Sequence, residues 1–342
     1  MTGSLPTTRG IGAAGWRYAL RRALHGFPLH RGLDSAAALT FFSILLIFPA
    51  TLVLVSAFAL ANGDTGRGVD RITDILGEFL TPDALRTARA LLASFSELPD
   101  PGIALAIGLA LGIWSMGSYA TAFGRAIDAV YEVQEGRPLW RFRGTMTLVA
   151  IALLVLFSIA AAILLTTPTV AEAIGETLDI APGWVLAFDI AKWPVLAALA
   201  VAIVGIIYFF TPNVRHARIR WVSWGAMGAI AAWGVATVLF GIYVLVVNSY
   251  DRVYGWLGGA IALIIWLYIT NLVLVLGAEL DAELVRVRQL TAGIEAEVAI
   301  RLPVRATARD DALVSRRDRD EREGRELRER SADEQPGKAV DA

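Results

Sequence analysis

The side chains able to support acid-base or metal chemistry are few in this sequence, and their spacing does not suit it. The three histidines, His25, His30 and His216, do not fall into a metal-binding motif. Cysteine is absent, which excludes thiolate catalysis, thiolate metal sites and disulfides. The long apolar stretches contain no paired carboxylates. We therefore expect no catalytic site, no metal and no cofactor, and the protein is not expected to be an enzyme.

One group of acids is placed where it could meet a solute. Glu279 directly follows the last apolar stretch, and Asp281 and Glu283 come after it. No apolar stretch has an ionisable residue at its centre, which argues against a buried proton relay or a coupling-ion site. Glu279 is therefore the acid expected at the inner mouth of a membrane pathway.

Proline and hydroxyl groups mark the first apolar stretch. Pro49 removes one backbone donor and its ring pushes against the carbonyl of Leu45, which predicts a kinked helix. Backbone groups freed at that depth need protein or water as partners, and Thr40 and Ser43 are near. The kink fits two interpretations equally, the wall of a cavity or an ordinary packing device.

Two amides also lie in apolar surroundings, Asn248 near the end of the fifth stretch and Asn271 within the sixth. An unpaired amide is costly in hydrocarbon, so both are expected to face protein or water. An interhelical hydrogen bond is the default interpretation, and contact with a substrate is the alternative. The candidate cavity residues are Thr40, Ser43, Pro49, Asn248, Trp266, Asn271 and Glu279.

Small residues recur at a spacing of four in two places. Gly108 and Gly112 form one such pair, and Gly255 and Gly259 form the other. Glycines at this spacing let helix backbones approach closely where lipid supplies no hydrophobic drive. They predict helix-packing surfaces, either within the chain or between copies in a homo-oligomer.

These residues are carried by six stretches of more than twenty residues that lack Asp, Glu, Lys, Arg and His. About 20 apolar residues in a helix cross the hydrocarbon core of a bilayer. The chain is 56% hydrophobic. We predict an all-α membrane protein with a six-span domain over residues 34–290. The spans are expected at about 36–61, 102–123, 145–170, 193–213, 221–249 and 254–278.

The placement of arginine and lysine predicts the orientation. The segment before the first span and the second and fourth loops carry twelve cations, whereas the three alternate loops carry six. Basic residues near span ends stay on the cytoplasmic side. Both termini are therefore expected in the cytoplasm, with the first span retained because its apolar run is too long for a secretory signal.

Asp189 and Lys192 leave the start of the fourth span open. If the helix begins at Pro194, a favourable first-turn residue, the two charges lie at the surface, and this interpretation is preferred. If it begins near Trp184, both lie in the outer leaflet region and can pair at i, i+3.

The segments outside the spans have distinct compositions. Residues 1–33 interleave arginines with aromatic and leucine residues, which predicts a basic amphipathic helix on anionic lipid headgroups rather than on nucleic acid. Residues 64–100 have two helical periodicities and are expected to form an extracytoplasmic helical hairpin. Residues 291–342 form a charged tail that is expected to be mostly disordered, with at most a solvated helix between Asp318 and Arg330.

Several segments together resemble the YihY/BrkB family of bacterial inner-membrane proteins. The similarity extends over about residues 20 to 290, with Thr211 as one departure where a larger apolar residue is expected. The matching segments are Asp34–Pro49, Ala126–Pro138, Tyr208–Arg215, Tyr254–Ala260, Trp266–Tyr268 and Leu276–Asp281.

The resemblance implies a six-helix protein of the bacterial inner membrane. Members have carried the name ribonuclease BN, but this chain lacks the histidine and acid clusters of a zinc ribonuclease. The leading hypothesis is a transporter-like protein that exports a small solute or handles lipid. The alternative is an envelope assembly or scaffold protein without a transported substrate, which would have a closed, filled bundle.

Overall fold

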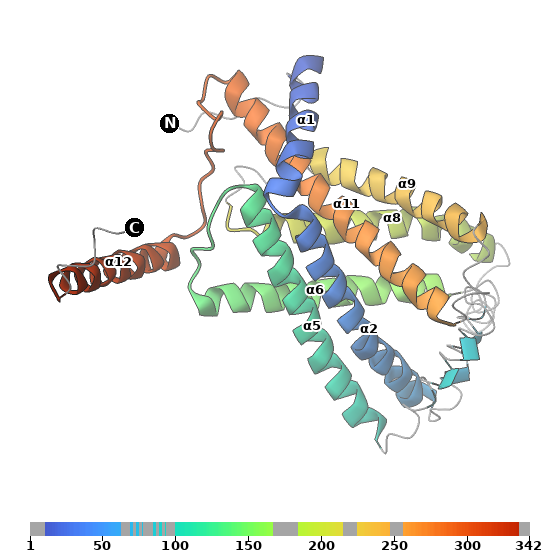
Figure 1. The fold of residues 1–342 in the computed structure, drawn as a ribbon. Helices are drawn as coiled ribbons and strands as arrows, with labels where there is room; N and C mark the ends of the chain where they lie inside the picture. The colour runs from blue at the N-terminus through green and yellow to red at the C-terminus, as the bar shows by residue number, and fades with distance from the viewer. Residues whose placement is uncertain are drawn as a thin grey trace.

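The computed structural model describes residues 11–62, 100–166, 184–214, 224–246 and 256–334, together with scattered positions between 69 and 93. Long helices account for most of the described chain, and they keep the labels of Figure 1. They are α1 (Ala13–Leu29), α2 (Gly32–Asn62), α5 (Pro101–Val130), α6 (Leu139–Leu165), α8 (Trp184–Phe210), α9 (Trp224–Val246), α11 (Trp256–Thr291) and α12 (Ala308–Glu334).

Six of these helices, α2, α5, α6, α8, α9 and α11, are long and apolar enough to cross a bilayer. This confirms the predicted all-α membrane fold and its six spans. α5 begins cleanly because Asp100 caps it, accepting hydrogen bonds from the backbone nitrogens of Gly102 and Ile103, with Pro101 in the first turn.

The fourth spanning helix begins earlier than predicted. α8 starts at Trp184, not at about residue 193, so Asp189 and Lys192 lie within the helix. Lys192 Nζ lies 2.5 Å from Asp189 Oδ1 and also over the ring of Trp193. The pair offsets the two charges at i, i+3, which removes the reason for starting the helix at Pro194.

Helices α2, α5 and α11 form the centre of the bundle, and Figure 1 shows α2 alongside α5. Gly108 of α5 lies against α2, where an added Cβ would be 3.0 Å from Val53 Cγ2 and 3.2 Å from the Val53 nitrogen. Gly112 lies beside Pro49 in the same contact. The partner helix of this glycine pair is therefore in the same chain.

The N-terminal helix α1 packs on the end of α11. Ala19 and Ala23 of α1 are buried, and a small apolar cluster joins Ala19 to Leu284 and Val287. One face of the expected amphipathic helix thus covers protein. Four large apolar residues of α1 remain exposed, and these are Trp16, Leu20, Leu24 and Leu29.

The tail differs from the expected disorder and extends the core beyond residue 290. We call residues 294–307 the strap. Ala296 and Ile300 of the strap are buried, and Val304 forms an antiparallel bridge with Val214. After the strap comes α12, an exposed helix with i, i+4 ion pairs such as Arg317 to Glu321. The physical reason is that apolar strap residues anchor the segment, and charge pairs support the solvated helix.

The predicted outer hairpin over residues 64–100 lies mostly outside the described residues, and it stays a prediction. The described positions between 69 and 93 are helical, and Arg89 Nη2 donates to Asp70 Oδ1 at 2.7 Å. The start of α12 lies against the α5–α6 loop, since the backbone nitrogen of Arg309 donates to the carbonyl of Gly136.

Candidate functional site

A polar cluster joins the three central helices at Asn271. Its Nδ2 donates to Thr40 Oγ1 at 3.2 Å and to Ser43 Oγ at 3.4 Å, both on α2. Its Oδ1 accepts from the hydroxyl of Tyr119 on α5 at 2.9 Å. Asn271 is 2% exposed and Thr40 is 5% exposed. The structure therefore brings together three of the predicted cavity residues, and their polar groups bond to one another.

Pro49 has a comparable environment. It is buried, and a Cβ added to Gly112 of α5 would lie 3.8 Å from Pro49 Cβ, an ordinary van der Waals distance. α2 continues through the proline to Asn62. The space beside Pro49 is occupied by α5, which corresponds to the packing interpretation of the proline.

A second polar cluster lies where α11 leaves the bundle. Glu279 is fully buried, and both of its carboxylate oxygens contact His30 Nδ1, at 3.0 and 3.1 Å. One turn later Glu283 accepts from Arg22 and from the fully buried Arg286. The carboxylate of Glu279 is thus buried against the α1–α2 junction, where His30 is its partner.

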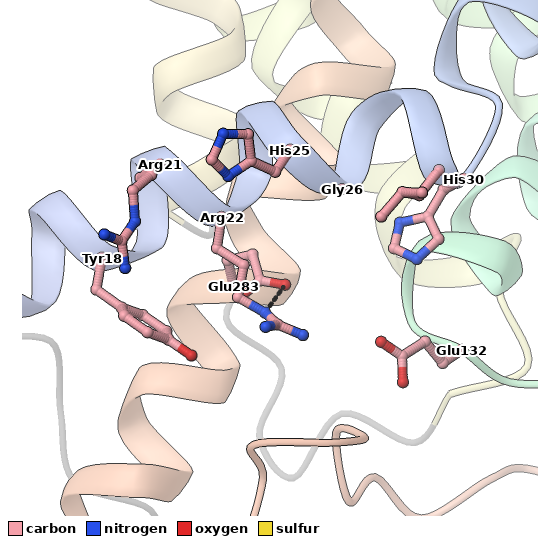
Figure 2. Close-up of a pocket in the computed structure, with 9 residues that line it drawn as sticks. Tyr18, Arg21, Arg22, His25, Gly26, His30, Glu132 and Glu283 are labelled. Atoms are coloured by element: carbon pink, nitrogen blue, oxygen red, sulfur yellow. Dashed lines mark hydrogen bonds and ion pairs between the residues drawn. The ribbon is translucent and has the colours of Figure 1, made fainter.

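A pocket of about 370 Å³ lies next to this cluster, between α1, α11 and the end of α5 (Figure 2). Figure 2 shows Arg22 of α1 bonded to Glu283, with Glu132 on the side of His30, and both acids also have Arg286 as a partner. Among the described residues, no group of three or more His, Asp or Glu is arranged to hold a metal ion.

The contact between His30 and Glu279 makes stability depend on pH. The hydrogen bond to Glu279 raises the pKa of His30, against the opposing effect of burial, and the charges of Glu132 and Glu283 raise it further. The contact is therefore complete below about pH 6.5, the ordinary histidine value, and is lost as the pH rises through the raised pKa.

We expect His30→Gln to reduce the change in the free energy of unfolding across this pH range by about 1 kcal/mol. The measurement is the free energy of unfolding in mixed detergent and SDS micelles between pH 6 and pH 9. His25→Gln is the matched control, because His25 lines the same pocket but has no hydrogen bond to Glu279. An unchanged pH profile in the His30 variant would contradict the assignment.

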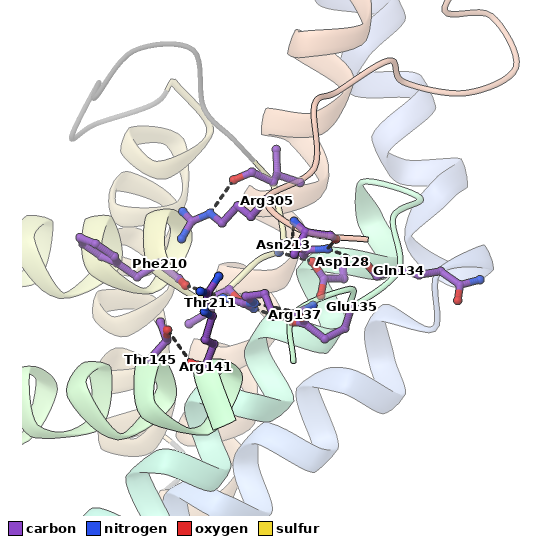
Figure 3. Close-up of polar contacts among 12 residues, drawn as sticks. Asp128, Gln134, Glu135, Arg137, Arg141, Thr145, Phe210, Thr211, Asn213 and Arg305 are labelled. Carbon is purple, nitrogen blue, oxygen red and sulfur yellow. Dashed lines mark hydrogen bonds and ion pairs between the residues drawn. The ribbon is translucent and has the colours of Figure 1, made fainter. Parts of the chain in front are cut away.

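A third polar cluster ties the α5–α6 loop to the end of α8 and to the strap (Figure 3). Asp128 Oδ1 accepts from the backbone nitrogen of Asn213 at 2.7 Å, and Asn213 Nδ2 donates to the carbonyls of Gln134 and Ala306. Arg137 donates to Glu135 and, at 2.6 Å, to the carbonyl of Thr211. The carbonyls at the end of a spanning helix are thereby satisfied by side chains.

The strap is held closely against this loop. Arg305 Nε donates to the carbonyl of Val214 at 2.9 Å. A Cβ on Gly136 would overlap the carbonyl oxygen of Ala306, so the close approach requires glycine at this position. The polar cluster and the strap together fix where α12 begins.

A groove of about 800 Å³ lies between α5 and α6, with one residue of α2 and the first turns of α12 in its walls. Its apolar part includes Phe42, Ala110, Ile113 and Trp114. Its other end is charged and includes Arg125 of α5, Arg143 of α6, Arg309 of α12 and Glu135. A second, apolar hollow of about 380 Å³ adjoins it and shares Ile113.

The remaining predicted residues do not join these sites. Asn248 and Gly255 lie outside the described residues, and Gly259 is exposed. Trp266 is partly buried on α11 and is not part of the Asn271 cluster. The packing role assigned to Gly255 and Gly259 therefore stays a prediction.

Sequence reasoning missed several residues that organise these sites. Tyr119 was not singled out because one tyrosine in an apolar helix carries no distinguishing pattern. Asp128, Arg137 and Asn213 lie in the segments Ala126–Pro138 and Tyr208–Arg215, which carried the family resemblance. That shared pattern was the available signal, although it gave no role to the individual side chains.

The fold and these sites define a polytopic α-helical membrane protein with a groove between α5 and α6. The family model described as Virulence factor BrkB matches residues 23–299. The chain belongs to this family, which confirms the resemblance found in the sequence.

Two relatives show the range of similarity. The chain is 26% identical over 278 residues to a protein of Bacillus subtilis described as ribonuclease-like protein YfkH, covering 79% of this chain and 96% of the relative. It is 30% identical over 275 residues to a UPF0761 membrane protein of Laribacter hongkongensis, covering 78% of this chain and 60% of the relative. No solved structure matches the chain.

Proposed function

We propose that this protein is a transporter-like membrane protein that handles lipid and catalyses no chemical reaction. The lipid would enter sideways from the bilayer into the groove between α5 and α6. The central bundle would serve as the scaffold that holds the groove open. The proposal takes the lipid branch of the transporter hypothesis, because the polar groups of the Asn271 cluster bond to one another whereas the groove joins apolar and cationic surface.

The groove itself carries this proposal. Along α5 it extends from Ala110 to Arg125. At about 1.5 Å per residue this is about 22 Å, close to half of the roughly 40–45 Å thickness of a bilayer with its headgroups. One end is apolar and the other is cationic, the same order as the chains and headgroup of a lipid in one leaflet. The adjoining apolar hollow prolongs the chain-binding surface.

The absence of catalysis is part of the proposal and is supported by the surroundings of the acids. Glu279, Glu283 and Glu135 are each engaged by a histidine or an arginine of the same chain. The name ribonuclease-like belongs to the relative from Bacillus subtilis. We propose the bacterial inner membrane as the location, with both termini inside, on the basis of the arginine bias of the loops.

A transport measurement tests the proposal. Purified protein is placed in phosphatidylcholine vesicles that contain a trace of fluorescent phosphatidylglycerol, and the rate at which label crosses the bilayer is measured by dithionite quenching. We expect wild-type protein to accelerate the crossing. Gly117→Phe should slow it roughly ten-fold, the effect of about 1.4 kcal/mol on a barrier, because Gly117 lines the groove and a ring would occupy it.

The matched control is Gly234→Phe on α9. An added Cβ at Gly234 has nothing within 4 Å, so the ring projects into open space away from the groove. This variant should keep the wild-type rate. If the labelled lipid crosses the bilayer no faster in vesicles with wild-type protein than in protein-free vesicles, the transport proposal is wrong.

The second candidate function is an envelope scaffold, and α12 favours it. Every residue of α12 from Asp311 to Ser331 is exposed, and Figure 1 shows the helix projecting from the bundle. A long charged helix of this kind offers a docking surface for a partner. The same vesicle experiment decides between the two functions, since a scaffold accelerates no lipid movement.

A further inference from the structure

We infer that the cationic end of the α5–α6 groove is a binding site for the headgroup of an anionic phospholipid, with α12 contributing one of its arginines. The inference rests on the proposed function and adds the chemical class of the lipid. It is also supported by separate observations on three guanidinium groups: the helices that carry them, their lack of partners within the described chain, and their position in the groove.

The charge in this part of the groove is strongly one-sided. Arg125, Arg143 and Arg309 line it, and Glu135 is the single acid among its lining residues. The Glu135 carboxylate is already engaged, because Arg137 donates to it from Nε at 2.8 Å and from Nη2 at 2.5 Å. The three arginines therefore face the groove without an acid to neutralise them.

These three arginines also differ from the structural arginines nearby. Arg22, Arg137, Arg286 and Arg305 all donate to a carboxylate or a carbonyl. Within the described chain, the guanidinium groups of the three groove arginines form no hydrogen bond or ion pair, whereas each offers up to five donors. Guanidinium suits phosphate oxygens because its planar fork can donate two parallel hydrogen bonds.

The third arginine is held in place by the strap. The backbone nitrogen of Arg309 donates to the carbonyl of Gly136 at 3.0 Å, and Asn213 bonds to Ala306 just before it. The first turn of α12 is thus fixed on the α5–α6 loop, and Leu313 in the next turn also lines the groove. The tail therefore completes the wall of the site.

The position of the cations selects a lipid over a soluble phosphate. The same hollow continues to Phe42, Ala110 and Ile113, so the ligand that fills it needs apolar chains as well as a negative headgroup. A zwitterionic headgroup would bring its own cation toward three arginines, which is unfavourable. The geometry accordingly fits a phosphatidylglycerol-type lipid better than phosphatidylcholine.

The test is lipid retention by the full-length protein, measured by native mass spectrometry in micelles with equal phosphatidylglycerol and phosphatidylcholine. Wild-type protein should retain phosphatidylglycerol preferentially. Each arginine near a membrane surface contributes roughly a five-fold change in binding, so Arg125→Gln, Arg143→Gln and Arg309→Gln together should weaken retention roughly one hundred-fold at low salt.

The control is the triple variant Arg316→Gln, Arg319→Gln and Arg322→Gln, which changes the net charge equally on the exposed part of α12. It should keep the preference. Both triple variants should melt like wild type, because neither set of side chains bonds within the described protein.

Three results would overturn the inference. They are an unchanged preference in the groove variant, an equal loss in both triple variants, and displacement of the lipid by millimolar inorganic phosphate, which would indicate a soluble-phosphate site. If retention depends on the groove arginines but labelled lipid does not cross vesicles, the headgroup site stands and the transport proposal fails.

Discussion

Replacing Arg286 with Met is expected to lower the free energy of unfolding by about 3–5 kcal/mol, the cost of breaking a buried ion pair from one side. Arg286 is fully buried, and its side chain donates to Glu283 at 3.0 Å, to Glu132 at 2.8 Å and to the carbonyl of Ala296 at 2.7 Å. The substitution leaves Glu283 with Arg22 alone and leaves the strap carbonyl without a donor.

The measurement is unfolding in mixed detergent and SDS micelles, with Arg317→Met as the control. Arg317 is exposed on α12 and pairs with Glu321 at i, i+4, so its loss should change stability by no more than about 0.5 kcal/mol. Arg286→Lys should fall between the two, because it keeps the charge but not the planar fork. A loss of less than about 1 kcal/mol in Arg286→Met would mean that this cluster does not stabilise the C-terminal end of α11.

Gly277→Ala is expected to separate α9 from α11 and to lower the free energy of unfolding by about 1–3 kcal/mol, the usual effect of overpacking. An added Cβ at Gly277 would overlap the Cβ of Ala229 on α9 and lie 2.8 Å from the hydroxyl of Tyr208 on α8. The opposite side of the contact is equally close, since a Cβ on Gly225 would be 2.6 Å from the carbonyl of Gly277.

Gly234→Ala is the control, and its effect on the free energy of unfolding is expected to be neutral or of opposite sign. Gly234 lies in the interior of α9, and an added Cβ there has nothing within 4 Å. Alanine is favoured over glycine in a helix by about 0.5–1 kcal/mol, so Gly234→Ala should be neutral or slightly stabilising. Equal effects of the two substitutions in the same micelles would show that close packing at Gly277 is unimportant.

The sequence predicted those parts of the fold that depend on the composition of long uninterrupted segments. Charge-free stretches located the spans, and the cost of an unpaired amide in hydrocarbon marked Asn271 as a residue that needs a partner. The start of α8 was predicted too far along the chain. In the sequence Asp189 and Lys192 are two separate charges, whereas in the helix they form an ion pair.

The groove could not be predicted in this way. Its three arginines come from α5, α6 and α12, and nothing in their local sequence indicates that the helices meet. The strap was missed for a related reason. A few buried residues such as Ala296 and Ile300 anchor it, whereas the composition around them is dominated by charge.

The strap also has a consequence for biogenesis. The ribosome makes the protein from its N-terminus, so Asp128, Arg137 and Asn213 are synthesised before residues 304–306. Until the strap arrives, the side-chain amide of Asn213 lacks its bond to Ala306, and the carbonyl of Val214 lacks Arg305. This end of the bundle can therefore be completed only after synthesis of the spans, which makes the strap the last part of the membrane domain to assemble.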